Sequence, residues 1–178
     1  MSHYNYTQTL KPIYEKAARL YREGKREPST YFNEEETTFL ESINCRIQDP
    51  YDFAEDFHNY GEPDYETFQL IQAVCRDYFL TVLDGTTTGQ TIGPADLPPK
   101  TDSIRGIAWL PRMAPKAKAK LRGELANEIM YGCGGDRSFF KEHDIHPAEF
   151  LNAVWRYEEN DEALIDWVEA RANKAKSK

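Results

Sequence analysis

The residues with the greatest capacity for chemistry lie in a glycine-rich turn at residues 131–137, YGCGGDR. Cys133 stands just before a predicted helix, and Arg137 follows in the first turn of that helix. Positive potential at such a position favours the thiolate, which is the nucleophilic form of cysteine. The turn therefore predicts a nucleophile or a redox thiol at Cys133, with His143 as its base if the fold brings the two together. A small buried cysteine in a tight turn is the structural alternative.

The same turn is also a candidate anion site. Gly134 and Gly135 precede Asp136, the residue predicted to cap the helix, and such turns present backbone N–H groups that bind anions. Arg137 adds a positive charge. We therefore expect this site to consist of Gly134, Gly135, Asp136 and Arg137.

A cluster of bases without an intervening acid precedes the turn. On a helix, Arg112, Lys116 and Lys120 would lie on one face, where like charges repel each other unless something anionic lies opposite. The anion could be a small ligand, an acidic segment of a protein partner, nucleic acid, or the 30 carboxylates of the chain itself. The full cluster is Arg112, Lys116, Lys118, Lys120 and Arg122.

Two histidines follow, His143 and His146. With Cys133 and Asp136 they include ligand types that zinc accepts, but their spacing matches no closed four-ligand pattern. We expect no metal and no cofactor, and we interpret His146, which precedes Pro147, as a residue at a helix entrance.

Apolar residues at helical spacing, together with caps and glycine stops, predict the elements that position these side chains. The prediction is a mainly α fold of seven or eight helices, either one body or two lobes joined by a connection rich in Thr, Gly and Pro. The predicted helices span 9–23, 34–44 after Asn33, 50–60 after Asp49, 65–83 after Asp64, 111–122 starting at Pro111 or Pro115, 137–140 after Asp136, a segment from Pro147, and one from Asp161.

The composition also predicts boundaries between the parts of the chain. Residues 1–85 form an N-terminal helical lobe, and residues 86–105 form the connection, with a short strand as an alternative near Thr91 and Ile92. Residues 106–170 form a C-terminal helical lobe. The lysine-rich residues 171–178 are expected to fray. Aromatic stripes are expected in the core, at Phe53, Phe57, Tyr60, Phe68, Tyr78 and Phe79.

The overall charge and the cysteines limit the class of protein. A net charge of −8 opposes binding to nucleic acid and to anionic membranes. Neither a leader peptide nor an apolar run of about 18 residues is present, so we expect a cytoplasmic protein. Three widely spaced cysteines predict reduced thiols rather than disulfides.

Three segments carry a resemblance to a known family: WLPRMAPKAKAKL, YGCGGDRSFF and EALIDWV. From about Gly106 to Val168 the chain resembles a bacterial family that is known only as a domain of unknown function, number 5069. The resemblance implies a shared fold and contributes no reaction. The N-terminal half has no counterpart in that family.

These observations support three functional hypotheses. The first is a binding or interaction module for a small anionic molecule or an acidic partner segment, held by Arg112, Lys116, Lys120 and the 134–137 turn. The second is an enzyme that uses Cys133. The third is a structural module whose protein partner docks on exposed aromatic residues. The sequence leaves the oligomeric state open.

Overall fold

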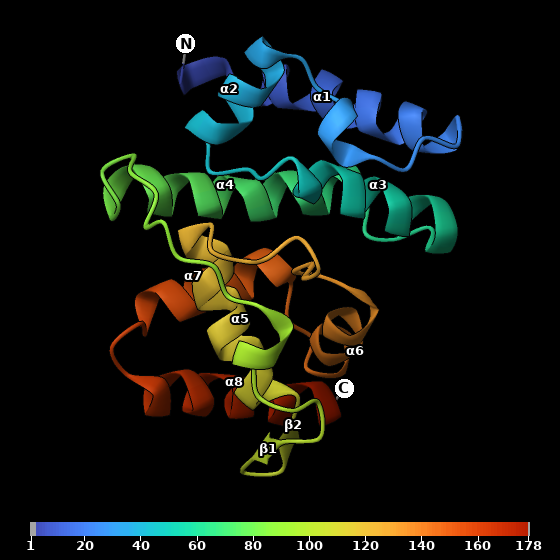
Figure 1. Cartoon of the computed structure of the whole chain (residues 1–178). Helices are drawn as coiled ribbons and strands as arrows, with labels where there is room; N and C mark the ends of the chain where they lie inside the picture. Colours follow the sequence, from blue (N-terminus) through green and yellow to red (C-terminus); the bar gives the residue numbers. More distant parts are fainter. Residues whose placement is uncertain (1–2, 178) are drawn as a thin grey trace. The chain divides into compact units, whose positions relative to one another are not determined.

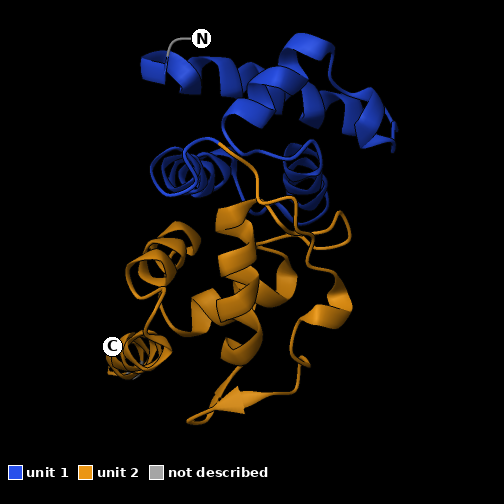
Figure 2. Cartoon of the chain, turned by 60° about the vertical axis from the view of Figure 1, so that its left-hand side comes forward, with its two compact units in different colours: residues 1–85 blue, residues 86–178 orange. Residues whose placement is uncertain are grey.

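Eight α-helices make up most of residues 3–177, the part of the chain that the computed structural model describes (Figure 1). The predicted mainly α fold is therefore confirmed. The chain divides into two compact units, residues 1–85 and 86–178 (Figure 2). Residues 86–105, predicted as a connection, belong to the second unit. No helix of the described chain is both long enough and apolar enough to cross a membrane.

The first unit contains four α-helices and two short 3₁₀ turns. Its elements are η1 (His3–Asn5), α1 (Tyr6–Arg22), η2 (Pro28–Thr30), α2 (Glu34–Ser42), α3 (Gln48–Tyr60) and α4 (Tyr65–Thr81). The predicted stripe of α1 is buried, and it packs mainly against α3. Burying a stripe of this kind supplies most of the stability of an amphipathic helix.

The caps of these helices follow local sequence signals. Asn33 and Glu36 form a reciprocal capping box at the start of α2, and the Asp64 side chain accepts a hydrogen bond from the Thr67 amide at the start of α4. The prediction that Asp49 caps α3 was wrong. That helix begins at Gln48, and Asp49 instead pairs with Arg46, whose Nη2 lies 2.5 Å from Oδ1.

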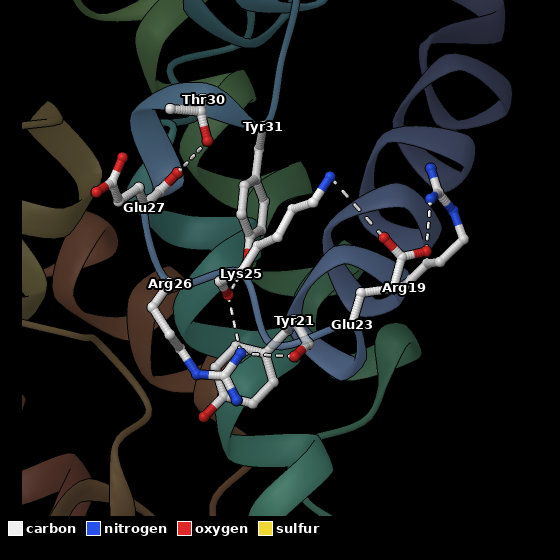
Figure 3. Close-up of polar contacts among 8 residues, drawn as sticks. All are labelled: Arg19, Tyr21, Glu23, Lys25, Arg26, Glu27, Thr30 and Tyr31. Atoms are coloured by element: carbon white, nitrogen blue, oxygen red, sulfur yellow. Dashed lines mark hydrogen bonds and ion pairs between the residues drawn. The ribbon is translucent and has the colours of Figure 1, made fainter.

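Tyr21 and Arg26 hold the segment between α1 and η2 (Figure 3). The Arg26 guanidinium lies 3.7 Å from the centre of the Tyr21 ring and donates to the Tyr21 carbonyl at 2.6 Å. The Tyr31 hydroxyl donates to the Lys25 carbonyl at 2.9 Å. These bonds satisfy the backbone of a loop that has little regular structure of its own.

The aromatic prediction was correct in the middle of the helices and wrong at the end of α3. Phe53, Phe68, Tyr78 and Phe79 are buried, but Phe57 is 46% exposed and Tyr60 is 70% exposed. The last turns of α3 contact α1 through polar side chains. Glu55 and Asn59 both hydrogen-bond the Tyr21 hydroxyl, and the His58 ring packs on Tyr21.

The second unit is centred on α5. Its elements are η3 (Pro94–Asp96), β1 (Ser103–Ile104), β2 (Ile107–Ala108), α5 (Leu110–Arg122), α6 (Gly134–Glu142), α7 (Pro147–Arg156) and α8 (Asp161–Lys176). Helix α5 packs against α7 and against β1. Gly123, at a φ of 72°, ends α5 where the sequence predicts a stop. Helix α8 continues to Lys176, across most of the segment predicted as a tail.

A two-stranded antiparallel hairpin, which the sequence did not predict, precedes α5. Ser103 pairs with Ala108 and Ile104 with Ile107. The two residues between them, Arg105 and Gly106, have φ values of 50° and 77°, as a tight type I′ turn requires. The Arg105 side chain then pairs with Glu162, Asp166 and Glu169 of α8. Near the predicted short strand, Ile92 makes a single parallel bridge to Leu125.

Asp52 of α3 is a buried acid in the first unit. It is 9% exposed and accepts a hydrogen bond from Gln48 Nε2 at 2.6 Å. Burial raises the pKa of Asp52 to about 7, and the nearby Asp49 carboxylate adds to this effect. The native state therefore binds this proton more tightly than the unfolded chain does.

This raised pKa predicts that stability falls as the pH rises from about 4, the pKa in an unfolded chain, to about 7. Asp52→Asn should remove that fall and stabilise the protein at pH 8 by up to roughly 4 kcal/mol, because a neutral amide has no charge to desolvate. Urea unfolding followed by far-UV circular dichroism at pH 4, 6 and 8 measures the difference. Asp56→Asn on the same helix is the control and should leave the fall in place. An equal pH dependence in Asp52→Asn and in the wild type would contradict the assignment.

Candidate functional site

A buried ion pair in the second unit connects α5 to the turn that begins α6. Lys116 Nζ lies 2.6 Å from Asp136 Oδ2, and the two side chains are 4% and 0% exposed. We name the residues around this pair, Trp109, Lys116, Cys133 and Asp136, the Cys133 cluster. Cys133 and Asp136 belong to the predicted turn at 131–137 and Lys116 belongs to the predicted basic cluster, whereas Trp109 is in neither.

Asp136 is the centre of the hydrogen bonding. Its carboxylate accepts from Lys116 Nζ, from the Gly132 amide at 2.9 Å and from Trp109 Nε1 at 3.1 Å. Three donors offset the cost of removing this charge from water. The prediction that Asp136 caps α6 was wrong. Cys133 occupies the N-cap position, while Asp136 lies inside the first turn, where its side chain reaches a charged partner on α5.

Cys133 lies at the edge of this buried pair. Its Sγ is 3.6 Å from the buried Lys116 Nζ, and the residue as a whole is partly exposed. Its side chain makes no capping hydrogen bond. The first bond within α6 runs from the Arg137 amide to the Cys133 carbonyl. The N–H groups of the first turn thus point toward the end of the helix that carries the sulfur.

Glycines and a tryptophan allow the turn to approach α5. Gly132 has a φ of 90°, which favours glycine. A Cβ placed on Gly135 would lie 2.5 Å from Cζ2 of Trp109, so this position admits only a hydrogen atom beneath the indole. Arg137 Nη1 closes the turn by donating to the Gly132 carbonyl at 2.8 Å. The sequence did not predict the role of Trp109; the local signal for a close approach is the density of glycines at 132–135.

The predicted basic face has intramolecular partners. Arg112 donates to the Pro98 carbonyl at 2.7 Å, Lys118 pairs with Asp161 at 2.9 Å, and Arg122 pairs with Glu158 at 2.6 Å. Lys120 is 3% exposed. Arg112, Lys118 and Arg122 therefore have separate acceptors within the second unit. Lys116 pairs with Asp136 of the turn at 134–137.

The structure does not bring His143 to Cys133. The histidine follows the last residue of α6 and the cysteine precedes the first, so at 1.5 Å per residue they are roughly 15 Å apart. His143 is 4% exposed and its Nδ1 donates to the Phe139 carbonyl at 2.7 Å. His146 caps α7 and accepts from the Ala148 amide, as expected for a helix entrance. Within residues 3–177, no three His, Cys, Asp or Glu side chains form a group that could hold a metal.

Two cavities of the second unit lie apart from the Cys133 cluster. One, of about 740 Å³, lies between α7 and α8 and is lined in part by Trp155, Arg156 and Trp167. The other, of about 300 Å³, lies between α5 and α8 and has the Lys118–Asp161 ion pair in its lining. Cys133 lines neither of these cavities.

The contact between Gly135 and Trp109 predicts a selective loss of stability. Gly135→Ala should destabilise the second unit by about 1–3 kcal/mol, because the added methyl group must displace an indole that is already bonded to Asp136. All three tryptophans of the chain, at 109, 155 and 167, lie in this unit. Tryptophan fluorescence during unfolding by urea therefore measures the stability of the second unit.

Gly134→Ala is the matched control for this prediction. A Cβ there meets nothing nearer than Arg137 Nη2, at 3.9 Å. Alanine at this position should be neutral or stabilise the unit by about 0.5 kcal/mol, because it restricts the unfolded chain. Equal unfolding midpoints for the two variants would show that the indole does not constrain the turn.

Comparison with curated proteins and with solved structures gives no match. Comparison with protein families gives one for the C-terminal part of the chain. The matched range starts before the β1–β2 hairpin and includes α5, α6, α7 and the whole Cys133 cluster. Residues 98–178 match the family described as a domain of unknown function, DUF5069, which confirms the resemblance that the sequence motifs predicted.

Proposed function

We propose that the C-terminal unit acts as a redox-responsive domain whose reactive group is the Cys133 thiol and whose substrates are peroxides. The observation that carries this proposal is the buried ammonium of Lys116, 3.6 Å from Sγ. A cation at this distance attracts negative charge that develops on the sulfur. The thiolate is the form that attacks the O–O bond.

Exposure separates Cys133 from the other two thiols. Cys45 is 3% exposed and Cys75 is fully buried, whereas Cys133 is partly exposed. A peroxide in solution therefore meets Cys133 first. The proposal includes a cytoplasmic location, where cysteines are kept reduced between oxidation events.

The site fits a thiol that is oxidised once per protein molecule better than it fits an enzyme that turns over many substrate molecules. His143, the predicted base, lies at the far end of α6. Cys133 is the single cysteine of residues 86–178, so the unit contains no second thiol to resolve an oxidised sulfur. The cluster offers an activating cation and solvent access without the base and acid that a hydrolytic cysteine enzyme requires.

The anion-binding hypothesis has less support from the geometry. Its three principal cations, Arg112, Lys116 and Lys120, are respectively bonded to a carbonyl, paired with Asp136, and buried. An external anion would have to compete with a carboxylate that is already in place. The Phe57 and Tyr60 side chains remain candidates for the protein-docking hypothesis.

The test measures the rate at which hydrogen peroxide oxidises Cys133 at pH 7. Dimedone traps the sulfenic acid, and peptide mass spectrometry locates it. Cys133 should react about tenfold faster in the native protein than in a peptide of residues 129–138, because the Lys116 cation is present only in the fold. A native rate no higher than that of the peptide would exclude the proposal.

Two lysine variants on α5 isolate the effect of the charge. Lys116→Gln should slow the oxidation about tenfold, whereas Lys118→Gln, which removes a cation paired with Asp161 away from the sulfur, should leave the rate unchanged. Lys116→Gln leaves the buried Asp136 carboxylate without its cation. The double variant Lys116→Gln/Asp136→Asn therefore replaces the ion pair with two neutral side chains. Tryptophan fluorescence verifies the fold in each case.

A further inference from the structure

We propose that Lys116 and Cys133 form a covalent cross-link when the thiol is oxidised, with Nζ bonded to Sγ as a sulfenamide. This inference rests on the proposed function, since it concerns the fate of the sulfenic acid that peroxide generates. The observation that supports it is the short distance between the Lys116 amine and the Cys133 sulfur. The amine of Lys116, a residue that is 3% exposed, lies 3.6 Å from the sulfur of Cys133, a residue that is partly exposed.

Lys116 is the nucleophile that this site supplies. A sulfenic acid is an electrophile at sulfur, and it condenses either with a thiol or with a nitrogen. The second unit has no other cysteine. The Lys116 side chain is held between Asp136 and Cys133, so its nitrogen approaches the sulfur without losing further conformational freedom.

The two steps balance with one equivalent of hydrogen peroxide. In the first, the Cys133 sulfur attacks the peroxide, an S–O bond forms, the O–O bond breaks and one water leaves. Sulfur is oxidised by two electrons and the peroxide is reduced. In the second, the Lys116 amine attacks that sulfur, an S–N bond forms, the S–O bond breaks, and the hydroxide leaves as water with a proton from nitrogen.

Asp136 assists the second step by accepting a proton from Lys116. The ammonium of Lys116 must lose a proton before its nitrogen can attack, and Asp136 Oδ2 lies 2.6 Å away as the acceptor. The resulting sulfenamide nitrogen carries no charge. Asp136 then loses its ionic partner, while Trp109 Nε1 still donates to Oδ1 at 3.1 Å. Trp109 therefore lies beside the reaction as a fluorescent reporter.

The experiment treats the full-length protein with about one equivalent of hydrogen peroxide, followed by alkylation and digestion with trypsin. Trypsin does not cleave after a modified lysine, so the cross-link should join residues 113–118 to residues 123–137. The joined peptides should weigh about 2 Da less than their sum, and a thiol reductant should separate them. The emission of Trp109 should change on oxidation and recover on reduction.

Lys116→Arg is the matched variant. It keeps the cation beside the sulfur, so Cys133 should be oxidised at a rate within about twofold of the wild type, but its guanidinium is a poor nucleophile. In this variant the sulfenic acid should accumulate, and the dimedone adduct at Cys133 should rise at least about fivefold over that of the wild type. Should the arginine disturb the fold, the joined peptides of the wild type still decide the question.

The outcomes separate the two proposals. Joined peptides in the wild type that vanish in Lys116→Arg support the cross-link. Wild-type Cys133 that is oxidised, yet yields only dimedone adducts or sulfinic acid, overturns the cross-link and leaves the reactive thiol intact. Wild-type Cys133 that resists peroxide overturns the proposed function, and the cross-link with it.

Discussion

The second unit depends on a charge pair that water cannot reach. Placing both Lys116 and Asp136 in the interior costs several kcal/mol for each ion, and the arrangement is tolerable only when their hydrogen bonds are satisfied. The Gly132 amide and the Trp109 indole supply the remaining donors to the carboxylate. Polar geometry therefore helps to fix the position of α6 against α5, and Trp109 and the glycines at 132 and 135 contribute to that geometry.

The first unit is organised on a different principle. One part of its core is formed by residues of α1 and α3 together with Tyr31, and Tyr21 is a shared contact there. The Tyr21 ring packs near Tyr51 and His58, and Arg26 lies over it. Two acids of α3, Asp49 and Asp52, are buried in this unit. Asp49 is paired with Arg46, whereas Asp52 has a pKa raised by burial, so the first unit contains a titrating acid in addition to an ion pair.

The sequence predicted those features that are set by nearby residues. The caps at Asn33 and Asp64, the stop at Gly123 and the entrance at His146 depend on bonds that span only a few residues. The sequence did not predict features set by residues far apart in the chain. Asp136 has the residue type and spacing of a helix cap, but its carboxylate instead pairs with Lys116, which is 20 residues away in the sequence.

Distance explains the other differences as well. Cys133 and His143 lie at opposite ends of α6, so two residues that are close in the sequence are far apart in the structure. The five bases of α5 have no acid between them, so the sequence suggested an external anion. Four of these bases have partners in other segments of the second unit, at Pro98, Asp136, Glu158 and Asp161.

The hairpin before α5 defines where the smallest complete domain begins. Glu162, Asp166 and Glu169 lie on successive turns of α8, so their carboxylates repel one another, and the guanidinium of Arg105 gathers all three. A fragment that started at Gly106, where the recognisable motifs begin, would leave these three carboxylates without Arg105, the cation that pairs with them. The family match begins at residue 98 and thus includes the arginine. The two short strands, whose buried side chain is Ile107, are therefore part of the domain also because of the charge that their turn presents.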